Sequence, residues 1–286
     1  MFFILTTIFF IFGLIIGSFL NVVILRFNTQ SLGGHSGCTS CNRQLTWHEL
    51  IPLLSFFILG RRCLNCKNKI SIQYPLVEFF TGIIFLSLFL KFQGPSLTPQ
   101  NSFFNNQTIF FITYIYYAIL FSILIVISVY DLKHKVIPDK LSLIFGIITF
   151  IGLFFFHNTV ALSRDFVFNP HFPNYLEFLS GFVISLPFAL LWLLSSGRLM
   201  GLGDAKLAIG LGWFLGWPMI FSGTVFAFWS GAIIGILGIL ISKIASRGIM
   251  GIKYTMKSEI PFAPFLVLGA ILTFFLEFNF FSFFYF

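Results

Sequence analysis

The sequence has 286 residues, of which 58% are hydrophobic and 20% aromatic, whereas only 9% are charged. Its mean hydropathy of +0.97 lies far above that of soluble domains, so a soluble globular protein is excluded. The formal net charge of +8 could suggest nucleic-acid binding, but the basic residues are scattered between apolar stretches rather than gathered on one face. The composition therefore predicts an all-α polytopic membrane protein that binds no nucleic acid.

Eight apolar stretches follow one another along the chain. A helix needs about 20 apolar residues to cross a hydrocarbon core of roughly 30 Å, and most of these stretches approach that length. We therefore expect about eight transmembrane helices. Their approximate ranges are 2–25, 76–92, 109–130, 141–157, 176–196, 205–220, 222–242 and 261–285.

The first stretch is interpreted as a membrane helix rather than a cleaved signal peptide. It lacks a basic start and an Ala-x-Ala-like cleavage site, and it continues directly into Arg26. The sequence is accordingly divided into a first transmembrane helix (1–26), a polar insert (27–75) and a seven-helix membrane domain (76–286).

The lysines and arginines predict the orientation in the membrane. With the N-terminus outside, 15 of the 17 basic residues fall on the inner side, and only Lys91 and Arg164 fall outside. Because basic residues gather on the cytoplasmic side of membrane proteins, this orientation is strongly favoured over its inverse. The insert at 27–75 is therefore expected to be cytoplasmic.

All four cysteines lie in this insert, as the two CxxC pairs Cys38/Cys41 and Cys63/Cys66. Two such pairs supply four thiolates, the ligand set that tetrahedral structural Zn²⁺ prefers. Structural disulfides are rare in a reducing compartment, and a redox motif would need one CxxC pair at a helix start. We therefore predict a closed, structural zinc site, with redox-active or free thiols as the alternative.

Two acidic residues lie where an apolar stretch meets the cytoplasmic side. Asp131 ends the third stretch, and Asp204 precedes the sixth within the sequence GLGDAK at 201–206. Two neighbouring carboxylates can hydrolyse a peptide, one deprotonating water while the other, protonated, polarises the scissile carbonyl. Gly201 and Gly203 would allow the backbone to come close to a substrate strand.

The same residues also allow a structural interpretation. Asp204 could sit at a helix N-terminus, where its negative charge is favoured, and Asp139, after Ile137 and Pro138, is a stronger candidate for such a cap. Acidic residues near membrane spans also serve transport and proton relay. The spacing alone leaves these alternatives open.

Five further sequence motifs follow one another along the chain. They are GSFLNVVI at 17–24 with Arg26, the insert with LTWHELIPLLS at 45–55 and YPLVE at 74–78, the segment 131–139, the segment 201–206, and IPFAPFL at 260–266. In this order they resemble the type IV prepilin peptidases, a family of GxGD-type intramembrane aspartyl proteases. Small departures are the doubled arginine before Cys63, the absence of a Leu-Pro pair after Arg26, and Ala263 in place of a frequent glycine.

The resemblance implies that Asp131 and Asp204 are the catalytic pair, supported by Gly201, Gly203 and Lys206. It implies cleavage of the basic leader of type IV prepilins or pseudopilins at the cytoplasmic face of the bacterial inner membrane. The N-terminus would be periplasmic, and the substrate helix would stay in the lipid bilayer.

The resemblance also implies that the new α-amine is methylated with S-adenosylmethionine. No glycine-rich fingerprint places this methyl donor, so Glu49 and Glu78 are guesses for its site, with ion pairs to basic residues of the insert as the alternative. A peptidase without methyltransferase activity and a proton-coupled transporter are the rival functions. The absence of a detectable inverted repeat weighs against the transporter.

Overall fold

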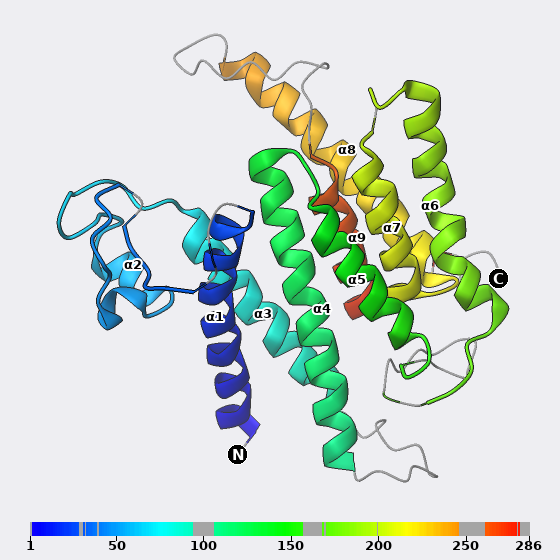
Figure 1. The fold of residues 1–286 in the computed structure, drawn as a ribbon, viewed down its shortest axis with the longest axis horizontal. Helices are drawn as coiled ribbons and strands as arrows, with labels where there is room; N and C mark the ends of the chain where they lie inside the picture. Colours follow the sequence, from blue (N-terminus) through cyan, green and yellow to red (C-terminus); the bar gives the residue numbers. More distant parts are fainter. Residues whose placement is uncertain are drawn as a thin grey trace. The chain divides into compact units, whose positions relative to one another are not determined.

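The computed structural model describes residues 2–28, 31, 33–38, 40–93, 106–156, 168, 170–198, 200–245, 261–278 and 280 (Figure 1). The chain divides into two compact units, Met1–Val126 (unit 1) and Ile127–Phe286 (unit 2). Within the described ranges the regular structure is helical, and pairing between extended segments is limited to two isolated bridges in the insert. The prediction of an all-α membrane protein is confirmed.

Unit 1 is built on the pairing of two long apolar helices. It contains α1 (Phe2–Arg26), the short 3₁₀-helix η1 (Trp47–Leu50), α2 (Leu54–Ile58), α3 (Gln73–Phe92) and the first part of α4 (Asn106–His134). Helices α1 and α3 come so close that a Cβ atom on Gly17 would lie 2.7 Å from the Cα of Glu78. Small residues allow such contact between membrane helices, where packing replaces the hydrophobic effect as the driving force.

Unit 2 is arranged around one short central helix, α7 (Leu202–Leu215), of which nine of 14 residues are buried. Around it lie the end of α4 and the helices α5 (Asp139–Gly152), α6 (Tyr175–Ser195), α8 (Met219–Ala245) and α9 (Ala263–Leu276). The end of α4 and the starts of α5, α7 and α9 lie together, in the upper part of Figure 1. This cluster of helix ends positions the acidic residues of the site.

Each of the eight predicted apolar stretches corresponds to one helix, but not every helix is long enough to span a bilayer. In the described part of the chain, five helices are long and apolar enough to cross a membrane: α1, α3, α4, α6 and α8. Helices α5, α7 and α9 have 14 residues each, fewer than the roughly 20 that a full crossing needs.

A glycine ends one of these short helices, α7. The stretch predicted at 205–220 stops at Gly216, which has a φ of 64° and is followed by Trp217 and Pro218. Arg164, Ile260 and residues 281–285 of the predicted last span lie outside the described residues.

Replacing Gly212 by alanine should destabilise unit 2, because the new Cβ would lie 2.5 Å from the Cα of Gly181. Overpacking of this kind costs about 1–3 kcal/mol. Gly146→Ala on α5 is the control, since its Cβ meets no atom within 4 Å. Thermal melts in detergent should show a lower midpoint for Gly212→Ala and an unchanged or higher one for the control; equal midpoints would contradict the close packing.

Candidate functional site

The four cysteines of the insert form one cluster in unit 1. Their sulfur atoms all lie within 4.8 Å of one another, and the Sγ atoms of Cys38 and Cys66 are 3.8 Å apart. A tetrahedral ion with Zn–S bonds of about 2.3 Å would hold its sulfurs about 3.8 Å apart. The cysteines are free thiols, so the cluster has the geometry of a metal site rather than of a disulfide pair.

The two CxxC pairs adopt the same backbone conformation, which explains why they face each other so well. In the first, the amide of Cys38 donates to the carbonyl of Arg43; in the second, the amide of Cys63 donates to the carbonyl of Asn68. The residue after each second cysteine, Asn42 or Lys67, has a positive φ. Each turn is then closed by one antiparallel bridge, Gly37 with Gln44 and Arg62 with Lys69.

Backbone amides prepare the sulfurs for a cation. Those of Cys66 and Asn65 lower the pKa of the Cys63 thiol to about 6. The amide of Asn68 favours the thiolate of Cys66, but burial and hydrogen bonds with the other three sulfurs raise the pKa of Cys66 to about 11. Without a cation, repulsion between neighbouring thiolates therefore keeps the four cysteine thiols from all losing their protons. A divalent cation would favour the form with four thiolates.

Glu49, one of the two glutamates considered for the methyl donor, lies in the insert beside Arg43. It forms an ion pair with the Arg43 guanidinium and accepts hydrogen bonds from the backbone amide and hydroxyl of Thr46, at 2.9 and 2.8 Å. Burial alone would raise the pKa of Glu49, but these hydrogen bonds and the Arg43 charge lower it overall. The contacts fit the structural alternative, in which Glu49 fixes the start of η1.

Glu78, the second glutamate, is only 8% exposed and is paired differently. Its carboxylate accepts a hydrogen bond of 2.9 Å from the backbone amide of Leu53 and one from the hydroxyl of Ser18. Among the described residues it forms no ion pair, so the alternative considered for Glu78 finds no support in its contacts.

Asp131 and Asp204 lie close enough in unit 2 to interact electrostatically. Asp131, near the end of α4, is 4% exposed, and Asp204, in the first turn of α7, is 7% exposed. The Oδ2 atom of Asp131 accepts a hydrogen bond of 3.2 Å from the amide of Ala263, the first residue of α9. The Oδ1 atom of Asp204 is buried without a partner.

The segments that carry the two aspartates are held together by two further contacts. A Cβ on Gly203 would lie 2.9 Å from the Cβ of Ile137, so only glycine lets α7 approach the α4–α5 turn. Lys206 Nζ lies 2.7 Å from Asp139 Oδ1. Helix α5 begins at Asp139 after the N-cap residue Pro138 and has no side-chain cap bond. Asp139 begins α5, as expected, but its exposed side chain forms an ion pair with Lys206 rather than a cap hydrogen bond.

The amide of Ala263 is the contact that sequence reasoning did not identify. The motif around Ala263 was noted only as part of the family resemblance, and a contact between residues 132 apart has no local signature. Ala263 is itself completely buried, and its small side chain allows the start of α9 to reach Asp131.

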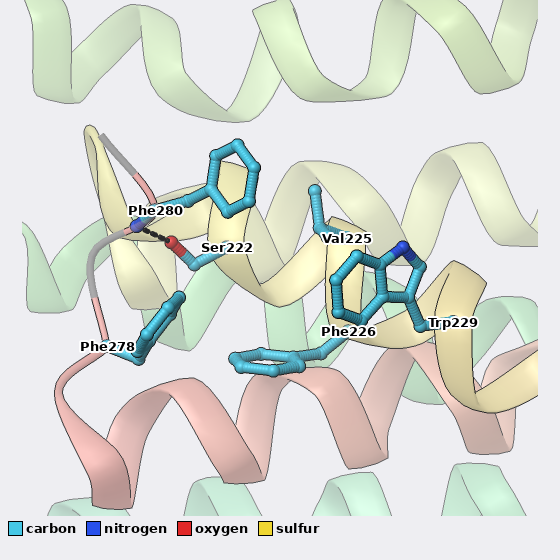
Figure 2. A pocket seen from close by; sticks show the side chains of 6 residues that line it. All are labelled: Ser222, Val225, Phe226, Trp229, Phe278 and Phe280. Carbon is cyan, nitrogen blue, oxygen red and sulfur yellow. Dashed lines mark hydrogen bonds between the residues drawn. The ribbon is translucent and has the colours of Figure 1, made fainter. Parts of the chain in front are cut away.

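An apolar pocket also occurs in unit 2, between α8 and the end of the chain (Figure 2). Its lining side chains are aromatic or aliphatic apart from Ser222, whose Oγ accepts the amide of Phe280 at 2.8 Å. The pocket contains no carboxylate, thiol or imidazole and supplies no group for hydrolysis. The residues that line it are Ser222, Val225, Phe226, Trp229, Phe278 and Phe280.

Comparison with known proteins matches both units to one family. Residues 11–92 match the bacterial peptidase A24 N-terminal domain, and residues 118–239 match the type IV leader peptidase family. The chain is 30% identical over 271 residues to a prepilin leader peptidase/N-methyltransferase of Bacillus subtilis (strain 168), covering 94% of this chain and 93% of that protein. The chain belongs to the type IV leader peptidase family.

Two further relatives of this family carry the same name. The protein of Klebsiella pneumoniae is 32% identical over 223 residues, covering 74% of this chain and 85% of the relative. That of Myxococcus xanthus (strain DK1622) is 31% identical over 239 residues, covering 81% of this chain but only 62% of the relative's length. No solved structure matches the chain significantly.

The two family matches divide the candidate groups between them. The N-terminal match contains the cysteine cluster and both glutamates, whereas the leader peptidase match contains Asp131 and Asp204. Ala263 lies beyond the second match, so its contact with Asp131 joins the matched segment to a part of the chain outside it.

Removal of the metal should disorder the insert, because its small core cannot replace four metal bonds. Purified, reduced protein should contain one zinc ion per chain, and Cys→Ser at any of the four positions should lower the zinc content and speed limited proteolysis within the insert. Leu64→Ser is the control, since Leu64 is an exposed side chain between Cys63 and Cys66. Wild-type protein without zinc by metal analysis would refute the site.

Proposed function

We propose that this chain is an intramembrane aspartic endopeptidase that removes the basic leader of type IV prepilins or pseudopilins and then N-methylates the new N-terminal residue. Family membership confirms the prediction of prepilin processing and argues against the proton-coupled transporter. The relatives are named as both peptidases and N-methyltransferases, which favours the bifunctional enzyme over a peptidase alone.

The observation that carries the catalytic proposal is the juxtaposition of Asp131 and Asp204 at the cluster of helix ends in unit 2. Two carboxylates in such a place do not both ionise easily, so the pair holds one proton. One member can then accept a proton from water while the other donates one. The pair therefore has the chemistry of a peptide hydrolase.

The hydrogen bonds suggest which member is the base. The anionic form of Asp131 is favoured by the amide of Ala263 and by the positive end of the α9 dipole. Asp204 Oδ1 has no partner in the described structure, and a protonated carboxyl there could donate to an incoming carbonyl. We assign Asp131 as the base that activates water and Asp204 as the acid that polarises the scissile carbonyl.

The reaction then follows in two steps. Water attacks the carbonyl carbon, its proton passes to Asp131, and the Asp204 proton passes to the carbonyl oxygen. Collapse of this intermediate then breaks the C–N bond. Asp131 donates the proton it took from water to the leaving amine, and Asp204 takes back its proton from the former carbonyl oxygen. Since an intact helix keeps its carbonyls hydrogen-bonded, the substrate must be extended at the cut. Gly201, where a Cβ would lie 3.6 Å from Asp204 Oδ2, leaves room for such a strand, whereas Gly203 is needed for the contact with Ile137.

The remaining assignments follow from charge and ligand chemistry. The distribution of Lys and Arg supports a multi-pass inner-membrane protein with a periplasmic N-terminus and a cytoplasmic insert. The thiols of Cys38, Cys41, Cys63 and Cys66 would hold a structural Zn²⁺ that fixes this insert. S-adenosylmethionine would supply the methyl group. The aspartates require neither group for hydrolysis.

Asp131→Asn and Asp204→Asn should each leave a folded, inserted protein that no longer cuts a prepilin. Loss of general acid–base catalysis lowers rates on the order of 10²–10⁴-fold. The measurement is the product mass after incubating purified protein with a prepilin, with and without S-adenosylmethionine. Wild-type protein should release the leader in both cases and add 14 mass units, the size of one methylene, only with the methyl donor present.

Asp139→Asn is the matched control for the two aspartates. Its ion pair with Lys206 is exposed and contributes about 1 kcal/mol or less, so cleavage should remain within a few-fold of wild type. Substantial cleavage by either the Asp131 or the Asp204 variant would contradict the assignment of these two aspartates as the catalytic pair.

A further inference from the structure

A polar cluster interrupts the apolar contact between α1 and α3 in unit 1. Ser18 and Asn21, about one turn apart on α1, contact α3 at Glu78 and Tyr74, which are also one turn apart. We call these four residues the α1–α3 seam. Under the predicted orientation, the end of α1 and the start of α3 both lie at the cytoplasmic edge of the membrane, the level at which a leader would be cut.

Glu78 is a buried acid that forms no ion pair with any cation in the part of the chain that the structure describes. It accepts one hydrogen bond from the amide of Leu53 and one from the hydroxyl of Ser18. A carboxylate has about four acceptor positions, so it can accept further donors. A buried carboxylate that lacks a cationic partner is costly, and such groups occur most often where a substrate supplies the missing charge or proton.

Asn21 provides a second, independent acceptor. The side chain is 2% exposed, and its Nδ2 atom donates to the carbonyl of Tyr74 at 3.1 Å. Its Oδ1 atom is buried and has no partner in the described structure. A buried carbonyl oxygen without a partner carries an uncompensated desolvation cost, which a bound donor would remove.

The loop that closes on Glu78 is strained. Leu53 has φ 59° and ψ −52°, and the amide of Leu54 donates to the carbonyl of Pro52 at 2.6 Å, which together define a γ-turn of the rare, strained type. The turn aims the Leu53 amide at Glu78. Strained residues of this kind gather at functional sites, where the surrounding structure holds them in place.

We propose that the α1–α3 seam binds the new N-terminal α-amine of the cleaved substrate, with Glu78 accepting its proton and Asn21 Oδ1 accepting its N–H. The proposal rests on the methyltransferase part of the proposed function. The unpaired Oδ1 of Asn21 and the further acceptor positions of the Glu78 carboxylate suit an ammonium group, a donor without acceptor capacity. The contacts also distinguish the two glutamates, because the carboxylate of Glu49 already pairs with Arg43 and accepts the amide of Thr46.

The chemistry balances with one methyl donor of the sulfonium class. The α-ammonium gives one proton to the Glu78 carboxylate and becomes a neutral amine. The nitrogen lone pair attacks the methyl carbon of S-adenosylmethionine, the C–S bond breaks, and its electron pair stays on sulfur. The product is a secondary ammonium, which can release a further proton to solvent. Glu78 acts here as a general base and takes part in no other bond change.

The test uses purified full-length protein, a mature pilin that already carries a free N-terminal amine, and S-adenosylmethionine. Glu78→Gln should lower the rate of methylation at neutral pH at least 100-fold. Asn21→Leu should raise the KM for the mature pilin about tenfold with a smaller change in kcat. Thr81→Val is the matched control, because Thr81 is a buried α3 residue whose hydroxyl donates to the carbonyl of Val77 in its own helix, at 2.6 Å.

A pH series distinguishes a base from a structural anchor. A free α-amine loses its proton near pH 7.7–8.0 without help. Methylation by Glu78→Gln should therefore recover about sixfold to tenfold as the pH rises from 7 through 8 to 9, whereas a distorted fold would not recover. The groups that contact Glu78 from α1 and from the loop, the Ser18 hydroxyl and the Leu53 amide, do not titrate in this range.

Each outcome decides the proposal. Unchanged methylation by Glu78→Gln at neutral pH would overturn it, as would a loss that no pH restores. Lost equilibrium binding of S-adenosylmethionine in this variant would instead place the methyl donor at Glu78 and also overturn it. If wild-type protein binds S-adenosylmethionine yet methylates no mature pilin, the methyltransferase function itself is rejected. Cleavage of a prepilin by the same protein would show that its peptidase function is intact.

Discussion

The catalytic proposal depends on holding two acidic side chains together where little water reaches them. Asp131 and Asp204 are almost completely buried, and their mutual repulsion would disfavour the fold if both were charged. One shared proton removes that repulsion, and the amide of Ala263 stabilises the charge that remains. In the proposed mechanism, the same single proton also provides one ionised carboxylate as the base and one protonated carboxyl as the acid.

Close backbone contact makes this arrangement possible. Gly203 allows α7 to meet Ile137 at the α4–α5 turn, and Gly212 allows it to meet α6 at Gly181. Helix α7 is thus fixed on two sides and carries Asp204 at its start. In lipid, where apolar side chains gain little by leaving the solvent, such contacts are a main source of packing energy. The site therefore depends on glycines that have no chemistry of their own.

The sequence predicted the parts whose signals are local. Apolar runs predicted the helices, and the CxxC spacing predicted the cysteine cluster. Helix ends were harder to predict from the sequence, because α7 ends before Gly216 although the apolar run continues past it. The contact of Asp131 with Ala263 and the unpaired Oδ1 of Asn21 arise only when distant helices pack, so no spacing rule could reveal them.

The central claim is that Asp131 and Asp204 share one catalytic proton, and the pH dependence of single-turnover prepilin cleavage tests it most directly. A pair that must hold one proton is inactive when it holds two and when it holds none. The rate should therefore rise and then fall as the pH increases, with its maximum between mildly acidic and neutral pH. A rate that climbs steadily into alkaline solution, while enzyme and substrate remain folded, would contradict the shared proton.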